Sequence, residues 1–199
     1  YESNSVMLLA ALQSVACNDV SIHRVKDDYE ATKTILSELI QKTDLLIISG
    51  GISVGDYDFV GKALRELAVT EHFYKVKQKP GKPLFYGEKE QCSIFALPGN
   101  PAAALSCFYV YVCAALCRKS HLPLARLPRE KATLSTAIPK LGDRAQFLKA
   151  YVENGKVRVL GSQSSAMLSS FSASNALVYL PEDYTAKKAG DIVELIKLP

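Results

Sequence analysis

Several features that define whole classes of protein are missing from this sequence of 199 residues. No uninterrupted apolar run reaches the ~18 residues of a membrane-spanning helix, and no signal peptide is recognisable. The formal net charge is only +4, and the basic residues form no long run that would suit nucleic acid. We therefore expect a globular, cytoplasmic protein that binds neither membrane nor nucleic acid. The small positive charge is still compatible with small anionic ligands.

The sequence also lacks the cysteine and histidine patterns of disulfide-rich, zinc-binding and hydrolytic-triad proteins. Five cysteines are an odd number, and we predict that all five are reduced thiols. Cys107, Cys113 and Cys117 lie in one apolar stretch with a spacing that suits packing. Cys113 and Cys117 could share a metal, but no histidine or second cysteine pair lies nearby. We interpret His23 as a strand residue rather than as a metal ligand.

The most informative stretch is residues 44–58, in which an apolar run leads into a glycine-rich turn. Leu45 to Ile48 form a short unbroken apolar run, which is typical of a strand covered on both faces in a parallel sheet. Gly50, Gly51 and Gly55 allow the backbone to turn sharply, and successive N–H groups in such a turn can bind phosphate. The pattern predicts a buried strand that ends in an anion-binding loop.

A helix is predicted directly after this loop. Residues 59–67 carry apolar side chains at helical spacing, and the positive end of the helix dipole would favour an anion in the loop. Asp56 and Asp58 would then lie where a phosphate-bound Mg²⁺ needs oxygen ligands. Two aspartates before a helix can also serve only as an N-cap and a partner of the dipole, so both interpretations stay open.

A second loop of the same design follows another apolar run, Ile94 to Leu97. Pro98 and Gly99 force a turn, Asn100 can hydrogen-bond the backbone beyond it, and Pro101 suits the first position of a helix. The pattern predicts a central strand, a tight turn and the start of a buried helix.

The segment between the two loops, residues 75–83, is basic and rigid. It contains four lysines, two prolines and one glycine. By itself such a segment is typical of a solvated surface connection, but beside two candidate phosphate loops its positive charges would have a partner.

Residues 49–58, 79–83 and 97–101, in this order and spacing, resemble the motifs of the molybdopterin molybdenumtransferases, which are related to the E domain of gephyrin. The resemblance continues in residues 1–4, 25–28, 142–147 and 189–193. It implies a function in molybdenum cofactor biosynthesis, in which adenylylated molybdopterin is bound, its adenylate is hydrolysed with Mg²⁺ present, and molybdate is inserted with release of AMP. Molybdopterin and molybdate would be the substrates and Mg²⁺ the cofactor.

The resemblance also implies roles for individual residues. Asp58 and Asp27 would be catalytic, and both would bind Mg²⁺ together with Asp56. The other binding residues would hold phosphate through backbone N–H groups, offset the charge of pyrophosphate or molybdate, or shape the second loop; they are Gly50, Gly51, Ser53, Gly55, Lys75, Lys79, Lys82, Pro98, Gly99, Asn100 and Pro101. From the residues alone, Asp27 and Asp28 read as the cap of a helix that runs to about residue 41.

We predict two domains for a chain that is 48% hydrophobic and 22% charged. Residues 1–127 would form a three-layer α/β domain with a mostly parallel sheet, of the molybdenum-cofactor-biosynthesis type, in which residues 20–25 form one strand. From residue 128 the pattern changes to short alternating runs with turn signals such as Asn154-Gly155, which predicts a small, barrel-like β domain over residues 128–199. The hydroxyl-rich segment 161–170 is either a solvated loop or reaches into the cleft.

By the resemblance, the chain is the C-terminal portion of a longer protein, and the first strand of its α/β domain is missing from it. A homodimer is also implied, with the pterin adenylyltransferase and molybdoenzymes as further partners. Two other functions compete with the transferase. A pterin adenylyltransferase would share both loops but would not need the β domain, and a non-catalytic scaffold would not need the carboxylates of Asp27 and Asp58.

Overall fold

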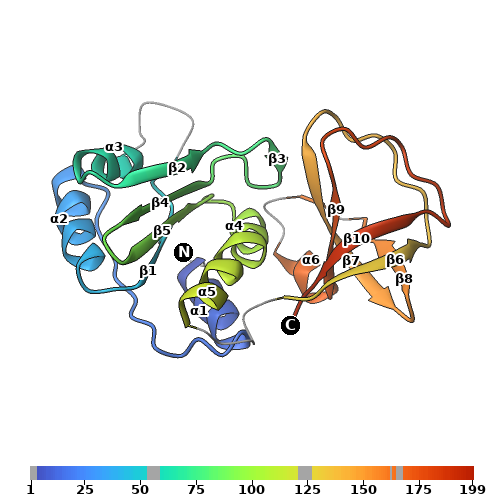
Figure 1. The fold of residues 1–199 in the computed structure, drawn as a ribbon, viewed down its shortest axis with the longest axis horizontal. Helices are drawn as coiled ribbons and strands as arrows, with labels where there is room; N and C mark the ends of the chain where they lie inside the picture. The colour runs from blue at the N-terminus through green and yellow to red at the C-terminus, as the bar shows by residue number, and fades with distance from the viewer. Residues whose placement is uncertain (1–3, 53–58, 121–126, 162, 165–167) are drawn as a thin grey trace.

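The structure is a computed structural model, and it describes residues 4–52, 59–120, 127–161, 163–164 and 168–199. The chain forms an α/β part followed by a β-barrel part, and the two lie side by side (Figure 1). This order of fold types agrees with the sequence-based expectation.

The α/β part is built on a four-stranded mixed sheet. In spatial order its strands are β1 (Leu45–Ser49), β5 (Cys92–Leu97), β4 (Phe85–Lys89) and β2 (Thr70–Tyr74). β1 and β5 are parallel, whereas β4 is antiparallel to both β5 and β2. The prediction of a mostly parallel sheet is therefore not confirmed. A tight turn at residues 90–91 joins β4 directly to β5, and a short buried apolar run carries no information about strand direction.

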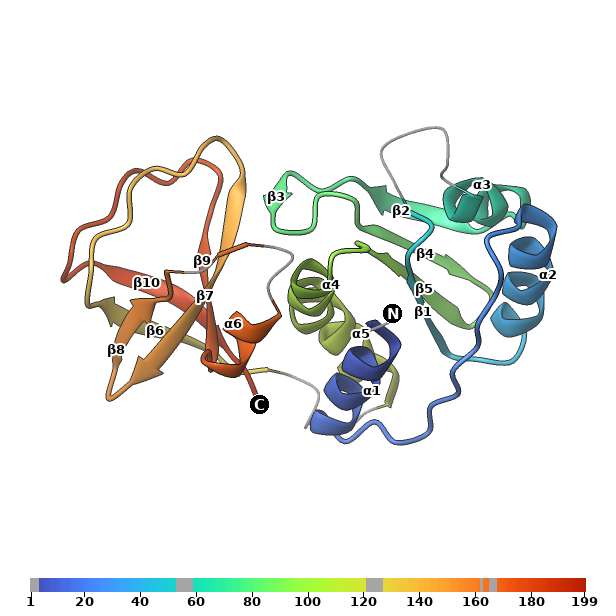
Figure 2. The same cartoon turned by 180° about the vertical axis from the view of Figure 1, so that it is seen from behind.

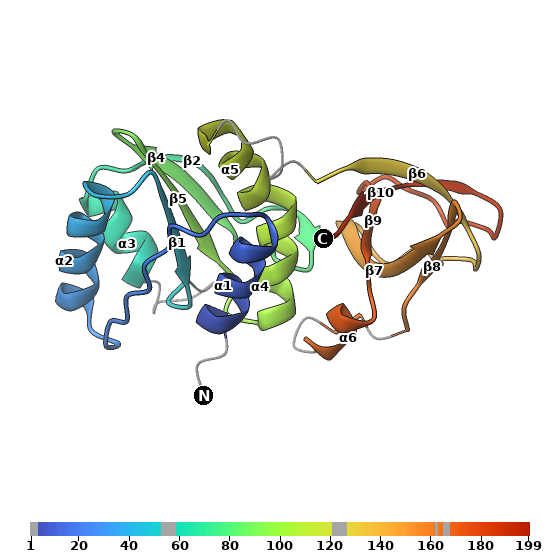
Figure 3. The ribbon, with the colours of Figure 1, turned by 90° about the horizontal axis from the view of Figure 1, so that it is seen from below.

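Helices cover both faces of this sheet. One face carries α2 (Tyr29–Ile40) and α3 (Phe59–Glu66), and the other carries α1 (Asn4–Ser14), α4 (Pro101–Cys107) and α5 (Cys113–Ser120), as Figures 2 and 3 show. Because side chains of β5 alternate between the faces, Ile94 and Ala96 pack against α2 and α3, while Phe95 and Leu97 pack against α1 and α4. The predicted three-layer arrangement is confirmed.

The strand predicted at residues 20–25 is wrong. This segment has no regular structure and makes no strand pairing with the described residues, and Ile22 and Val25 are 48% and 46% exposed. An alternating apolar pattern specifies a strand only where a neighbouring strand supplies backbone partners, and the pattern itself does not contain that neighbour. The following cap is as expected, since the backbone N–H of Ala31 donates to Asp28 Oδ1 at 2.8 Å and α2 begins at Tyr29.

The helix predicted after the second loop runs from residue 101 to residue 120 and contains a π-helical turn, η1 (Phe108–Val112), between α4 and α5. By length and mean hydropathy (1.4), residues 101–119 would suffice to cross a membrane, although no uninterrupted apolar run has that length. Of this stretch, 56% is buried inside the protein, where Phe108 and Val112 are fully covered. It is a core helix, and core helices pass the same length and composition test.

The barrel part contains five strands that close into a ring. They are β6 (Arg129–Leu134), β7 (Ala145–Glu153), β8 (Lys156–Val159), β9 (Ala176–Leu180) and β10 (Ile192–Lys197), in the order β7-β8-β6-β10-β9 with β9 paired back to β7. The predicted hairpin turn joins β7 to β8, and both of its residues have positive φ, 49° at Asn154 and 72° at Gly155. These angles are those of a two-residue type I′ turn, which favours Asn-Gly. The barrel-like fold is confirmed.

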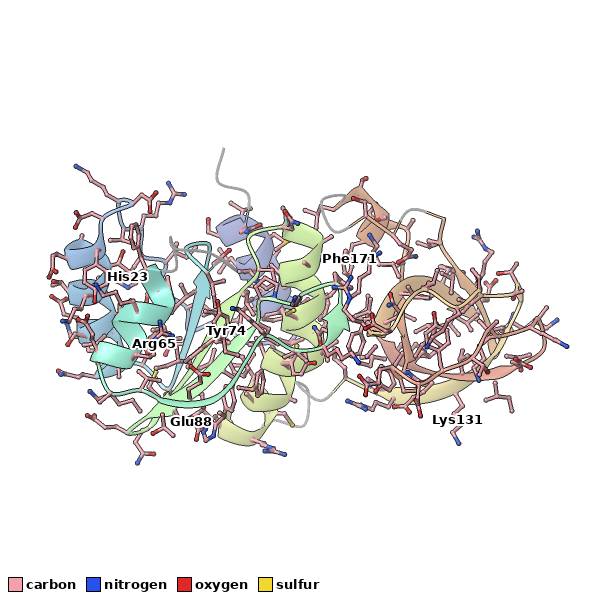
Figure 4. The ribbon with its side chains drawn as sticks, turned by 90° about the horizontal axis from the view of Figure 1, so that it is seen from above. His23, Arg65, Tyr74, Glu88, Lys131 and Phe171 are labelled. Carbon is pink, nitrogen blue, oxygen red and sulfur yellow. The ribbon has the colours of Figure 1, made fainter. Side chains whose placement is uncertain are left out.

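Two features join the parts. A two-residue strand of the basic segment, β3 (Gln78–Lys79), pairs in parallel with the start of β7. An apolar cluster at the junction contains Phe147 and Leu177 of the barrel, with Tyr109 of η1 and Phe171 of the short helix α6 (Ser169–Ser172) packed against it. Figure 4 shows Phe171 between the two parts. A cavity of about 360 Å³ lies at this junction, beside β3.

Candidate functional site

The two glycine-containing loops emerge at the same edge of the sheet. β1 and β5 are parallel neighbours with Ser49 opposite Leu97, so the loops that follow these residues leave the sheet together. Gly50 and Gly51 have φ values of +86° and +67°, which only glycine adopts without strain. A Cβ on Gly51 would lie 2.8 Å from Val60 Cγ2, because this loop packs closely against α3. The predicted sharp turn after the first strand is confirmed.

The second loop also has the predicted form. Asn100 precedes α4 and Pro101 is its first residue, while the backbone N–H of Ala104 donates to Asn100 O at 2.9 Å and closes the first turn. The side chain of Asn100 does not cap the helix. Gly99 and Asn100 are exposed, whereas Pro98 is buried beneath them. The exposed backbone of this loop therefore faces solvent beside the glycine-rich loop.

Asn4 ties the two loops together. Its Nδ2 donates to Ser49 Oγ at 2.8 Å and to the backbone oxygen of Gly99 at 2.9 Å. Sequence reasoning quoted Asn4 within the motif at residues 1–4 but assigned it no role. The only signal for it was its place in that motif. Ser49 and Gly99 are 45 and 95 positions away from Asn4 in the chain, and no local pattern reveals contacts over such separations.

The basic segment packs against the second loop and α4. Gly81 has φ +89°, and a Cβ built on it would lie 2.3 Å from Cys107 Sγ and 3.7 Å from Pro98 Cγ. Gln78 is 2% exposed; its Nε2 donates to Pro80 O at 3.1 Å, and its Oε1 accepts from the hydroxyl of Tyr111. All three motifs therefore converge at one edge of the molecule.

Burial keeps the groups beneath the basic segment neutral. It raises the pKa of the Cys107 thiol to about 12 and the pKa of the Tyr111 hydroxyl to about 12. A protonated, fully buried thiol is a poor nucleophile. Cys107 thus supports the basic segment by packing against Gly81.

The lysines of the basic segment divide into two groups. Lys77 lies 3.2 Å from Glu182 Oε2 and 4.0 Å from Asp143 Oδ2, so two carboxylates of the barrel part offset its charge. Lys75, Lys79 and Lys82 are exposed and have no carboxylate within ion-pair distance in the described part of the chain. These three are the lysines that the sequence predicted as ligands, and the Lys75 amine lies 4.9 Å from the centre of the Tyr74 ring.

Of the three predicted carboxylates, only Asp27 lies among the described residues. Asp27 is exposed one residue before the cap of α2, and no contact joins it to the glycine-rich loop among those residues. Ser53, Gly55, Asp56 and Asp58 lie outside the described residues. Among the residues that are described, no three His, Cys, Asp or Glu side chains could together hold a metal ion.

Two other predicted features lie away from the three loops. His23 is exposed beside α2, at the end of the molecule far from the barrel (Figure 4), and its Nε2 lies 3.1 Å from Ser21 Oγ. It is therefore a surface loop residue and not the strand residue we expected. In the hydroxyl-rich segment, Ser164 O and Ser170 Oγ accept hydrogen bonds from the buried Lys149 amine on β7. Leu168 of the same segment packs against the apolar cluster of the α/β part, so the described part of the segment contacts both parts of the protein.

A polar cluster around Glu88 occupies the opposite end of the sheet from the start of α1 (Figure 4). Tyr86 donates its hydroxyl to Glu88 Oε1, and His72 Nε2 lies 3.0 Å from Glu88 Oε2. The hydrogen bond from Tyr86, and next that from His72, lowers the pKa of the Glu88 carboxyl below its ordinary value of 4.5. Its folded-state pKa is thus below its unfolded-state pKa, so its contribution to stability is complete above pH 4.5 and is lost as the pH falls through the folded-state pKa.

We expect Glu88→Gln to lower the free energy of unfolding by less than about 1 kcal/mol at pH 7, because the side chains of Glu88 and His72 are partly exposed to solvent. The difference between wild type and variant should shrink below pH 4.5, as the wild-type carboxyl becomes protonated. Urea unfolding of both proteins at pH 7 and at pH 3 measures this. An equal difference at the two pH values would contradict the assignment.

Comparisons with known proteins address the whole chain. Residues 1–118 match the family described as "Probable molybdopterin binding domain", and residues 131–198 match the family described as "MoeA C-terminal region (domain IV)". The chain is 33% identical to the molybdenum cofactor synthesis protein cinnamon of Drosophila melanogaster, with 96% of this chain and 33% of that protein covered. It is 32% identical to molybdopterin molybdenumtransferase 2 of Mycobacterium tuberculosis, with 96% of this chain and 49% of that protein covered.

A solved structure has the same fold. The molybdopterin biosynthesis moeA protein of Pyrococcus horikoshii superposes with a TM-score of 0.78 at 28% identity, over 98% of this chain and 46% of that one. The chain thus spans between a third and a half of the length of these relatives.

Proposed function

This chain belongs to the molybdopterin molybdenumtransferase family, and from that premise we propose that the full-length protein inserts molybdate into adenylylated molybdopterin and releases AMP. The observation that carries the proposal is the convergence of three loops at one edge of the sheet, with Asn4 bridging two of them. A ligand that carries phosphates beside a large polar ring system needs such an extended site, in which backbone donors and positive charges lie together.

Each part of the site would have its own task. Backbone N–H groups after Ser49 would bind the phosphates of the adenylylated substrate, because the chain turns sharply at Gly50 and Gly51 and successive N–H groups in a turn can bind an anion. Lys75, Lys79 and Lys82 would offset the charge of pyrophosphate and of the incoming molybdate dianion. The proposed reaction breaks the bond between the pterin phosphate and AMP by attack of water, so the leaving AMP carries one phosphate away.

Carboxylates would complete the site. Asp27, Asp56 and Asp58 are the proposed ligands of Mg²⁺, since hard cations prefer carboxylate oxygens. The bound ion would offset charge on the phosphates and lower the pKa of an attacking water. Asp58 follows the glycine-rich loop directly in sequence, which supports its assignment as the principal ligand and catalytic residue.

The experiment that tests the function measures AMP release from adenylylated molybdopterin by the full-length protein, with and without molybdate. Release that depends on molybdate would establish the transferase. Tight pterin binding without any release would overturn the enzyme and leave a scaffold. Formation of adenylylated molybdopterin from ATP and molybdopterin would instead identify a pterin adenylyltransferase. The proposed homodimer and cytoplasmic location need separate measurements, by light scattering and by cell fractionation.

A paired set of lysine variants tests the charge of the site. We expect the double variant Lys79→Met, Lys82→Met to bind adenylylated molybdopterin about 10- to 100-fold more weakly, because each charged hydrogen bond to phosphate contributes on the order of 1 kcal/mol or more. Its affinity should also depend less on salt concentration. Titration at two ionic strengths measures both effects.

Lys77→Met is the matched control, because two carboxylates of the barrel already offset the charge of Lys77. It should leave the affinity within about twofold of wild type. Equal weakening in the control and in the double variant would show that general charge, and not these two side chains, determines binding.

A further inference from the structure

We propose that Asn4 is a positioning residue that fixes the glycine-rich loop and the Pro-Gly loop relative to one another, so that both can engage one ligand. The inference rests on the proposed function and identifies a residue that holds its site in shape. It starts from two hydrogen bonds of one side-chain amide, to Ser49 Oγ and to Gly99 O.

The chemistry of the partners fixes the orientation of the amide. The Gly99 carbonyl can only accept a hydrogen bond, so the Asn4 nitrogen and not its oxygen must face it. Both amide protons are then used, one on each loop. Since Ser49 Oγ accepts from Asn4, its own proton remains to be donated elsewhere at the site.

The bond to Gly99 also sets a backbone donor. A trans peptide unit is planar, and its C=O and N–H groups point in opposite directions. Holding the Gly99 oxygen toward Asn4 therefore turns the N–H of Asn100 away from Asn4. Asn4, which lies 96 positions earlier in the chain, thus sets the orientation of the Asn100 amide in the exposed second loop.

The helix that carries Asn4 packs into the core. α1 is anchored by Leu8, Ala11 and Leu12, which are 4–7% exposed and belong to the core cluster that also contains Leu97 at the end of β5. The amide is therefore held by a packed helix, while the loops that it joins are exposed.

The other polar atom of the Asn4 amide is not used by the described residues. Its Oδ1 is buried and has no hydrogen-bond partner among the described residues. A buried acceptor without a partner opposes folding, and such groups in folded proteins are concentrated where function requires them. An apolar residue that packed at the start of α1 would avoid this cost but would leave the two loops unconnected.

Three variants of the full-length protein separate positioning from folding. Asn4→Ala removes both hydrogen bonds, Ser49→Ala removes one and leaves α1 intact, and Ser14→Ala removes a hydrogen bond at the far end of the same helix, to Ala11 O at 2.7 Å. Affinity for adenylylated molybdopterin, hydrogen exchange of residues 49–52 and 97–100, and the melting temperature are measured for each.

We expect Asn4→Ala to weaken ligand affinity about tenfold and to speed hydrogen exchange in both loops together. Ser49→Ala should weaken affinity about threefold and affect mainly the first loop, and Ser14→Ala should match wild type in affinity and in both loops. Hydrogen exchange of residues 8–12 of α1 should stay unchanged in Asn4→Ala. If the substitution acted only by destabilising the helix, exchange of these residues would become faster.

The outcomes distinguish the two proposals. If wild type binds the ligand and Asn4→Ala has the same affinity and the same hydrogen exchange in both loops, the positioning role is overturned. The proposed function would then still stand. Wild type that binds no pterin would overturn the proposed function and, with it, the role assigned to Asn4. A loss of affinity in Asn4→Ala that is matched by Ser14→Ala would attribute the effect to the helix and overturn the positioning role as well.

Discussion

Asp58→Asn and Asp27→Asn, each in the full-length protein, are expected to lower molybdate-dependent AMP release at least about 100-fold. In the proposed mechanism each carboxylate acts through Mg²⁺, and weakening a group that stabilises the charge of the transition state has effects of this size. Each substitution keeps the shape of the side chain and removes its negative charge, so the binding of Mg²⁺ should weaken as well. AMP release at a series of Mg²⁺ concentrations, with pterin affinity measured beside it, tests both effects.

Asp28→Asn provides a matched control one residue away from Asp27. Asp28 caps α2 through its Oδ1, and asparagine caps helices about as well as aspartate does. The control should therefore keep both the wild-type rate and the wild-type stability. Full activity in Asp27→Asn would show that Asp27 is not catalytic. It would then be an exposed residue that only precedes the cap of α2.

Gly81→Ala is expected to destabilise the protein by about 3 kcal/mol or more. Two costs add: the backbone has φ +89°, and the new methyl group would lie 2.3 Å from Cys107 Sγ and 3.0 Å from Gln78 Nε2. The sulfur is fully buried and cannot move aside without disturbing α4. Because Gly81 lies between Lys79 and Lys82, ligand affinity should fall together with the free energy of unfolding.

Gly50→Ala separates the two costs. Gly50 has a similar φ, +86°, but among the described residues no atom lies within 4 Å of a Cβ built on it, so its substitution should cost about 1–2 kcal/mol for the backbone conformation. The double variant Gly81→Ala, Cys107→Ala should regain part of the lost stability, since it removes the atom in the way. Urea unfolding of all three variants measures the costs. Equal losses for Gly81→Ala and Gly50→Ala would show that packing against Cys107 contributes little.

Local sequence patterns were sufficient wherever one segment determined its own structure. The first strand, the Asn154-Gly155 turn and the helix start at Pro101 all follow from residue types within a few positions. The expected burial was wrong for one strand: β5 is buried along its whole length, whereas Leu45 to Ile48 of β1 are only half-buried, because β1 lies at the edge of the sheet and has a neighbouring strand on one side only.

The patterns failed where a partner from elsewhere in the chain decides the outcome. Residues 20–25 have a strand pattern but no paired neighbour in the described structure, and the direction of β4 depends on the turn that joins it to β5. The contacts of Asn4 likewise depend on distant residues, and so does the ion pairing of Lys77 with carboxylates of the barrel. Such information is tertiary, and no window of local sequence contains it.

The pairing of β3 with β7 means that the barrel helps to hold the basic segment, and with it the proposed lysine ligands, in place. The backbone N–H of Ala145 donates to Lys77 O at 3.2 Å, and Gln78 and Lys79 pair with Ala145 and Gln146. The basic segment thus contacts α4 on one side and the barrel on the other. Exchanging the barrel for an unrelated C-terminal domain would therefore alter ligand affinity even if the α/β part still folded.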